Sequence, residues 1–138
     1  MWQGYGDGVV RVQGFDHLVL RCHDVEKTLA WYIDELGLEP ERVEEWRAGS
    51  APFPSARVDA GTILDLIPGG PDGIVDGRLD HICLVVDADS VERVASPDSG
   101  FEVLAGPVPR YGARGMATSV YIRDPDGLMV ELRSYPSS

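Results

Sequence analysis

The sequence predicts an α+β fold in which two successive β-α-β-β-β modules, residues 14–68 and 79–135, form one domain of 138 residues. The first observation behind this prediction is an internal repeat, because one Asp-His pair ends at His17 and another ends at His81. Each histidine is followed, 48 and 50 residues later, by an acidic residue and a leucine. The second observation is that one order of strand-like and helix-like segments occurs twice. Because each half is too small to bury its own sheet, we expect one domain rather than two.

The first module begins with a strand over residues 15–22, FDHLVLRC, which is rich in β-branched and apolar residues. Asp24 then offers an N-cap to a helix that runs through Leu36, and Gly37 is the C′ residue that ends it. One face of this helix is apolar, since hydrophobic residues recur at helical spacing: Val25, Leu29, Ile33 and Leu36. Strand-like stretches follow near residues 41–47, 55–59 and 62–67.

The second module repeats this order after a connector at residues 68–78, which is dense in glycine, proline and aspartate. A strand over 79–87 and a short helix over 88–95 come first. Three strands are then expected, near residues 101–104, 117–123 and 128–135. A loop rich in glycine, proline and arginine separates the first two at 105–116, and a tight turn joins the last two at 124–127.

Strand parity places four polar side chains on comparable faces of the predicted strands. Because side chains alternate between the two faces of a strand, His17, Asp65, His81 and Glu131 lie opposite aliphatic residues that suit packing against helices. The four polar groups converge if the mixed sheet curves into a cup. Taken singly, each such residue is more often structural, but their repetition in register favours a shared site. Two imidazoles and two carboxylates are a ligand set for one divalent metal ion.

Composition excludes several classes of partner. The net charge is −11, from 23 acidic and 12 basic residues, which disfavours nucleic acid and anionic membrane surfaces. No apolar run approaches the about 20 residues of a membrane span, and the N-terminus lacks the pattern of a signal peptide, so we expect a cytoplasmic protein. Cys22 and Cys83 are expected to be free thiols.

Three segments resemble the vicinal oxygen chelate superfamily, which includes glyoxalase I, bleomycin-resistance proteins, fosfomycin-modifying enzymes and extradiol dioxygenases. They are FDHLVLRCHDVEKTLAWYIDELGL (15–38), LDHICLVVD (79–87) and SVYIRDPDGLMVEL (119–132). The resemblance covers residues 14–135, and the run 106–132 is also similar to an uncharacterised glyoxalase domain-containing subfamily. The resemblance implies a glyoxalase-like fold, with paired modules whose sheets form a cup around a divalent metal.

The resemblance also implies a set of site residues. His17, His81 and Glu131 match the usual metal ligands of the family. Asp65 stands where bacterial glyoxalase I has a glutamate; being one methylene shorter, it either ligates directly, binds through a water, or leaves a three-ligand set. The implied cofactor is one divalent ion, Ni, Co, Mn, Fe or Zn, and no organic cofactor is implied. Tyr121 matches a substrate-contacting tyrosine of fosfomycin-modifying relatives.

The function implied is that of a metal-dependent lyase or isomerase of the glyoxalase type, acting on a small molecule that chelates the metal through oxygens. Glu131 is the expected proton shuttle. Arg110, Tyr111 and Arg114, in the predicted loop, are candidates to clamp an anion. Two alternatives stay open: an Fe(II) extradiol-type dioxygenase, and a non-catalytic protein that sequesters a drug or metabolite. We expect a homodimer, in which the modules pair either within one chain or across two.

Overall fold

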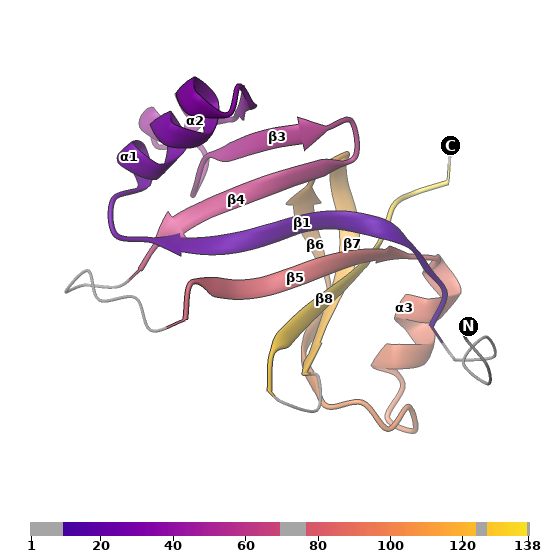
Figure 1. Ribbon diagram of the computed structural model, residues 1–138. Coiled ribbons are helices and arrows are strands. Elements are labelled where there is room, and N and C mark those ends of the chain that lie inside the picture. The colour runs from indigo at the N-terminus through magenta and orange to yellow at the C-terminus, as the bar shows by residue number, and fades with distance from the viewer. Residues whose placement is uncertain (1–9, 70–76, 124–126, 138) are drawn as a thin grey trace, which may run out of the picture. The chain divides into compact units, whose positions relative to one another are not determined.

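The computed structural model describes residues 10–69, 77–123 and 127–137 (Figure 1). The chain divides into two compact units, an N-terminal unit, Asp16–Ile82, and a C-terminal unit, Met1–Phe15 with Cys83–Ser138. The described residues contain eight strands, paired both parallel and antiparallel, and few helices. This confirms the predicted α+β class with a mixed sheet. No helix in the described ranges is long and apolar enough to cross a membrane.

The N-terminal unit has the predicted β-α-β-β-β order with one added helix. Its strands lie in the order β2-β3-β4-β1, in which β1 and β4 are parallel and the other neighbours are antiparallel. The elements are β1 (Val12–Cys22), α1 (Val25–Ala30), η1 (Trp31–Glu35), β2 (Glu39–Glu41), α2 (Val43–Arg47), β3 (Ser55–Asp59) and β4 (Thr62–Pro68).

The predicted first helix forms, but its last turns differ from an α-helix. Asp24 caps it by accepting a hydrogen bond from the backbone N–H of Lys27 at 3.1 Å, and Gly37 ends it at φ 74°. The segment η1 is wound as a π-helix, which changes the angular spacing of the residues. Leu29 is buried as expected, but Leu36 is 54% exposed, so its predicted place on the apolar face is wrong.

The strand predicted near residues 41–47 is also wrong. Only Glu41 belongs to β2, and the helix α2 starts at Val43, after Arg42 in the left-handed region at φ 56°. Val43 is buried and Trp46 packs partly against the same core. These two apolar residues are three positions apart, which is helical spacing that the short stretch did not distinguish from a strand.

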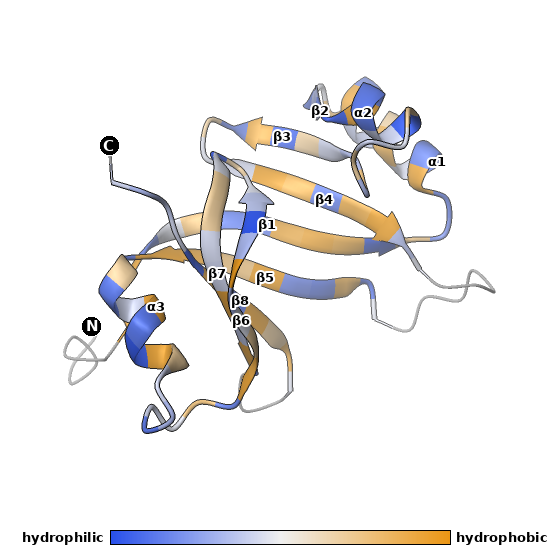
Figure 2. Ribbon diagram, turned by 180° about the vertical axis from the view of Figure 1, so that it is seen from behind, coloured by the Kyte–Doolittle hydropathy of each residue, from blue (hydrophilic) through white to orange (hydrophobic). Residues whose placement is uncertain are grey.

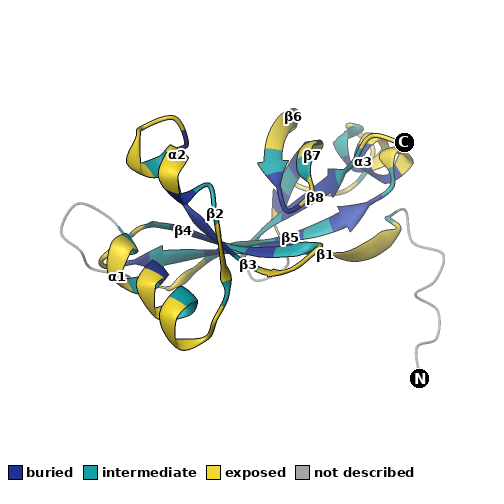
Figure 3. Ribbon diagram, turned by 90° about the horizontal axis from the view of Figure 1, so that it is seen from above, coloured by how far each residue is buried: buried dark blue, intermediate teal, exposed yellow. Residues whose placement is uncertain are grey.

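The core of the N-terminal unit lies between its sheet and its helices. It consists of the buried residues Cys22, Leu29, Val43 and Leu66. Leu20 and Leu66, from the predicted aliphatic face, pack here, which confirms the parity argument for β1 and β4. Figure 2 shows β1 and β4 hydrophobic over much of their length, interrupted by short hydrophilic bands. Figure 3 shows α1 largely exposed on its outer side.

The C-terminal unit repeats the order, with the strands β5-β8-β7-β6 and a helix that packs on β6, β7 and β8. Its elements are β5 (Leu79–Val86, which starts in the N-terminal unit), α3 (Ala88–Ala95), β6 (Val103–Gly112), β7 (Gly115–Arg123) and β8 (Met129–Ser134). Asp87 caps α3, because its Oδ1 accepts from the backbone N–H of Ser90 at 2.9 Å. The core of this unit is aliphatic, formed by Val86, Val91, Val94, Val120, Ile122 and Leu132.

The loop predicted at 105–116 is instead mostly β-strand. β6 continues through Gly112, and a two-residue turn leads directly into β7 at Gly115. β6 lies at the end of the strand order, where proline and glycine are tolerated because one side of an edge strand needs no ladder partner. The pairing also skips residues between Ala105 and Val108, which places a bulge in this stretch. Most of the connector 68–78 and of the turn 124–127 lies outside the described residues.

Candidate metal centre

His17 lies on β1 in the N-terminal unit and is held by its neighbour in the sequence. Its Nδ1 is 2.7 Å from Oδ2 of Asp16, and both side chains are almost completely buried. An ionised carboxylate can only accept hydrogen bonds, so Nδ1 is the donor of this pair. In a neutral imidazole this arrangement leaves the lone pair on Nε2, which is the state that a metal ligand requires.

His81 has the same local arrangement with one added member. Its Nδ1 is 2.8 Å from Oδ2 of Asp80, and Oδ1 of Asp80 forms an ion pair with Nη2 of Arg21 at 2.6 Å. The rings of His17 and His81 stand edge to face, with centroids 5.7 Å apart. The N-terminal unit thus brings together the two histidines that the repeat predicts, each with an aspartate on Nδ1.

Asp65 lies on β4, in the strand next to β1, opposite Val19 in the pairing register. It is buried, and Oγ of Ser55 donates to its Oδ1 at 2.5 Å. Its Oδ2 is 3.7 Å from Nε2 of His17. The shorter acid therefore comes close to the ring atom that would ligate a metal.

Glu131 lies on β8 in the C-terminal unit and is 1% exposed. Its Oε2 accepts from Oγ of Ser119 at 2.7 Å and from Nη1 of Arg133 at 3.1 Å. Arg133 is also buried, and its Nη2 donates to the backbone carbonyls of Arg110 and Gly115 at 2.9 and 3.0 Å. The buried guanidinium of Arg133 therefore gives the glutamate a charged hydrogen-bond partner in the interior of this unit.

Tyr121 stands directly opposite Glu131 in the pairing of β7 with β8. Burial, and secondarily the negative charge of Glu131, raise the pKa of Tyr121 to about 12. The guanidinium of Arg110, 5.8 Å from the centre of the tyrosine ring, opposes this rise. Tyr121 is therefore a neutral phenol near neutral pH and can donate a hydrogen bond.

Three residues hydrogen-bond to the predicted carboxylates but were not expected from the sequence: Ser55 at Asp65, and Ser119 and Arg133 at Glu131. The serines extend the internal repeat, because in both units a serine on the neighbouring strand donates to the predicted carboxylate. Arg133 lies two residues after Glu131 in β8 and therefore on the same face of the strand. Pairing a serine with each carboxylate requires the register of two strands, which the sequence does not give.

The candidate anion clamp lies on regular structure rather than in a loop. Arg110 and Tyr111 belong to β6, and Arg114 is in the two-residue turn. The guanidinium of Arg114 lies 4.4 Å from the ring centre of Tyr135. The proposed clamp stays a prediction, but the loop in which these residues were placed is wrong, because most of that stretch is β-strand. Cys22 and Cys83 are not joined in a disulfide, as predicted, and both are buried.

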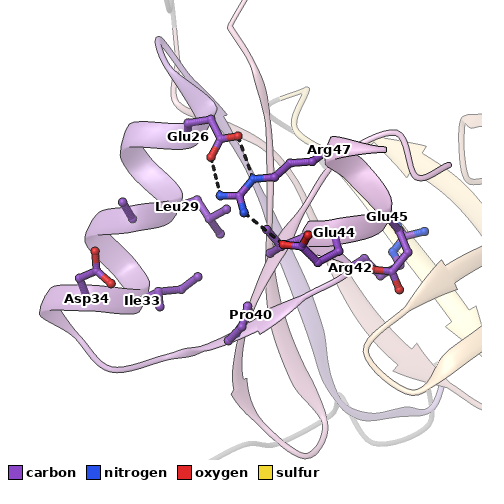
Figure 4. Close-up of a pocket in the computed structure, with 11 residues that line it drawn as sticks. Glu26, Leu29, Ile33, Asp34, Pro40, Arg42, Glu44, Glu45 and Arg47 are labelled. Atoms are coloured by element: carbon purple, nitrogen blue, oxygen red, sulfur yellow. Dashed lines mark hydrogen bonds and ion pairs between the residues drawn. The ribbon is translucent and has the colours of Figure 1, made fainter. Parts of the chain in front are cut away.

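A cavity of about 540 Å³ lies in the N-terminal unit between α1, η1 and α2 (Figure 4). Leu29, Ile33 and Val43 contribute apolar side chains to it. At its rim Arg47 pairs with Glu26 at 2.8 Å and with Glu44 at 3.2 Å. Among the described residues, its lining includes no predicted site residue, so size alone does not make it the functional site.

The sequence model of the glyoxalase/bleomycin resistance protein/dioxygenase superfamily matches residues 14–132. A glyoxalase domain-containing protein of Mycosarcoma maydis is 31% identical over 97% of this chain and 75% of its own length. A virulence protein of Salmonella typhimurium is 28% identical over 90% of this chain and 85% of its own length.

Among solved structures, the Mn(II)-bound glyoxalase from Novosphingobium aromaticivorans has a similar fold, with a TM-score of 0.63 and 22% identity. The match covers 91% of this chain but only 40% of that one. The family match spans most of the chain, and the fold is that of glyoxalase-like structures. The chain therefore belongs to the glyoxalase/bleomycin resistance protein/dioxygenase superfamily.

Proposed function

We propose that this chain is a metal-dependent enzyme of the glyoxalase type, a lyase or isomerase acting on a small molecule that chelates the metal through oxygens. The observation that carries the proposal is the pair of adjacent imidazoles, His17 and His81, each with an aspartate on Nδ1. This is how proteins usually orient metal-ligating histidines. The related glyoxalase from Novosphingobium aromaticivorans, which was solved with Mn(II), supplies a precedent for a divalent ion.

The donor set suits a divalent ion. We propose His17, His81 and Glu131 as ligands, with Asp65 as a fourth because its Oδ2 lies 3.7 Å from Nε2 of His17. Two neutral imidazoles and two carboxylates accept Ni, Co, Mn, Fe or Zn, and affinity alone does not choose among them. When bound, the ion supplies a Lewis acid that polarises substrate oxygens.

The chain's own residues supply the proton transfer. We propose that Glu131 takes a proton from a substrate carbon next to a carbonyl and returns it to the neighbouring carbon or oxygen. Ser119 and Arg133 hold this side chain in place while it carries the proton between the two transfers. Tyr121, which is neutral at the working pH, would donate a hydrogen bond to a substrate oxygen.

Metal content tests the first half of the proposal. Protein purified without a histidine tag or chelator should bind one equivalent of metal, and added Ni, Co, Mn or Zn should raise its thermal midpoint. His17→Gln and His81→Gln should each weaken that binding strongly. His23→Gln is the matched control, because His23 is the third histidine of the chain and is exposed. A wild-type protein that neither carries metal nor gains stability from it would contradict the proposal.

Proton exchange tests the second half. The metal-loaded protein in deuterium oxide should incorporate deuterium next to the carbonyl of an α-hydroxy ketone, and Glu131→Gln should abolish this.

Oxygen consumption with catechols in the iron-loaded protein would instead assign the dioxygenase alternative. Tight, metal-independent binding of a cationic drug would assign the sequestering alternative. A cytoplasmic homodimer is part of the proposal, and sedimentation analysis tests the dimer.

A further inference from the structure

The two Asp-His pairs differ in their surroundings, although the sequence repeats them. Asp16 is completely buried, whereas the side chain of Asp80 is 18% exposed. Asp80 also divides its two oxygens, with Oδ2 on Nδ1 of His81 and Oδ1 on Nη2 of Arg21. Asp80 thus lies between an imidazole, a guanidinium and solvent, while Asp16 is out of contact with water.

We infer that Asp16 and Asp80 are positioning residues that fix the ring tautomer and orientation of the two histidines, and that Asp16 has the stronger effect. The inference rests on the proposed function in one respect, namely that His17 and His81 bind the metal through Nε2. A carboxylate on Nδ1 holds the proton there, so Nε2 has a lone pair before any metal arrives.

The stronger effect of Asp16 follows from its burial. Inside a protein the effective dielectric constant is low, so the carboxylate polarises the His17 ring more than a carboxylate in contact with water would. Asp80 is partly exposed to water and forms an ion pair with Arg21 at 2.6 Å. Arg21 also anchors Asp80 in space, since its Nη1 donates to the backbone carbonyl of Gly77 at 2.8 Å. Asp80 is therefore well placed but weaker as an acceptor toward His81.

Replacement of each aspartate by asparagine tests the inference, since the two side chains have nearly the same shape. An amide can present either its N–H₂ or its carbonyl oxygen to Nδ1, so the tautomer is no longer imposed. Nitrogen-proton correlation spectra of the metal-free protein should show His17 and His81 with the proton on Nδ1. Asp16→Asn should change this state at His17 only, and Asp80→Asn at His81 only. Asp34→Asn, at an exposed aspartate of η1, is the matched control.

Metal affinity gives a second readout, measured as Zn or Mn competition with a chelating dye. We expect Asp16→Asn to lower the affinity about 100-fold and Asp80→Asn about 10-fold, within the range known for such neighbours of metal ligands. Equal losses, or a larger loss for Asp80→Asn, would overturn the ranking. If buried Asp16→Asn fails to fold, the partly exposed Asp80→Asn still tests whether an aspartate fixes the tautomer.

The two readouts separate the inference from the proposed function. If His17→Gln loses metal but Asp16→Asn keeps both its tautomer and its affinity, the inference is wrong and the proposed function stands. If His17→Gln binds metal as the wild type does, the proposed function is wrong. The tautomer spectra, which need no metal, then decide the positioning role alone.

Discussion

Gly106 on β6 packs against the backbone of Ser119, the residue whose side chain donates to Glu131. The residue has φ 98°, in the region that favours glycine, and lies in the bulge between Ala105 and Val108. A Cβ added there would overlap the backbone carbonyl oxygen of Ser119 and come within 3.0 Å of Cα of Val120. We therefore predict that Gly106→Ala pushes β7 away from β6 at this point.

The loss of unfolding free energy expected in Gly106→Ala is the sum of two contributions. The left-handed backbone costs alanine about 1–2 kcal/mol, and forcing a methyl group into packed backbone costs a further about 1–3 kcal/mol. The free energy of unfolding should therefore fall by about 2–5 kcal/mol. Gly115→Ala separates the terms, because Gly115 has the same φ of 98° in the same hairpin but nothing within 4 Å of its added Cβ. That variant should lose only the first term.

Equilibrium unfolding in urea measures both variants against the wild type, with the slope of the transition checked for constancy. Gly106→Ala should have the lower midpoint by the equivalent of about 1–3 kcal/mol. Equal midpoints for the two variants would refute the steric argument and leave only backbone strain. Because Ser119 donates to Glu131, Gly106→Ala should also disturb that hydrogen bond, which Gly115→Ala leaves in place.

Three further predictions concern buried polar groups. Ser119→Ala removes the donor to the buried glutamate and should cost about 1.5–3 kcal/mol in urea unfolding, whereas Thr118→Ala, at the exposed neighbour, should cost far less. The raised pKa of Tyr121 favours the folded state while its phenol is neutral, so this stabilisation is complete below pH 10 and lost as the pH rises toward 12. Unfolding measured across that interval should show a larger loss of stability in the metal-free wild type than in metal-free Tyr121→Phe. Cys22 and Cys83 are buried, and burial raises the pKa of the Cys22 thiol, so an aromatic disulfide reagent should label both only after unfolding; rapid labelling of the native protein would contradict their burial.

The two histidines were singled out from the sequence, but the contact of each with its preceding aspartate was not predicted, because adjacent side chains of a regular strand point to opposite faces. Asp16-His17 and Asp80-His81 need no knowledge of the fold to be noticed, and their repetition indicated two modules. Strand parity added the faces, which the packing of Leu66 and Leu132 into separate cores confirms. Where one face of a long strand was aliphatic, the alternation of side chains was sufficient to predict which face packs into the core.

The mistakes occurred where tertiary context overrides local signals. Glycine and proline at 105–116 indicated a loop, but an edge strand with a bulge tolerates both. The stretch 41–47 is too short for periodicity to separate a strand from the helix α2. Ser55 and Ser119 were missed because each acts across a strand pair, and the register of that pair depends on the hairpin between the strands.

The contacts of the predicted ligands bear on how the substitutions should be interpreted. Buried polar groups without partners are costly, so a site that relied on metal alone would destabilise the metal-free fold. Here the histidines are held by aspartates, and Asp65 and Glu131 by serines, in each case from within the same unit. Each predicted ligand therefore has at least one polar partner from the chain itself when no metal is bound. A histidine-to-glutamine variant that loses metal while keeping its fold would thus report on ligation, and the serine and aspartate variants would report on how the ligands are held.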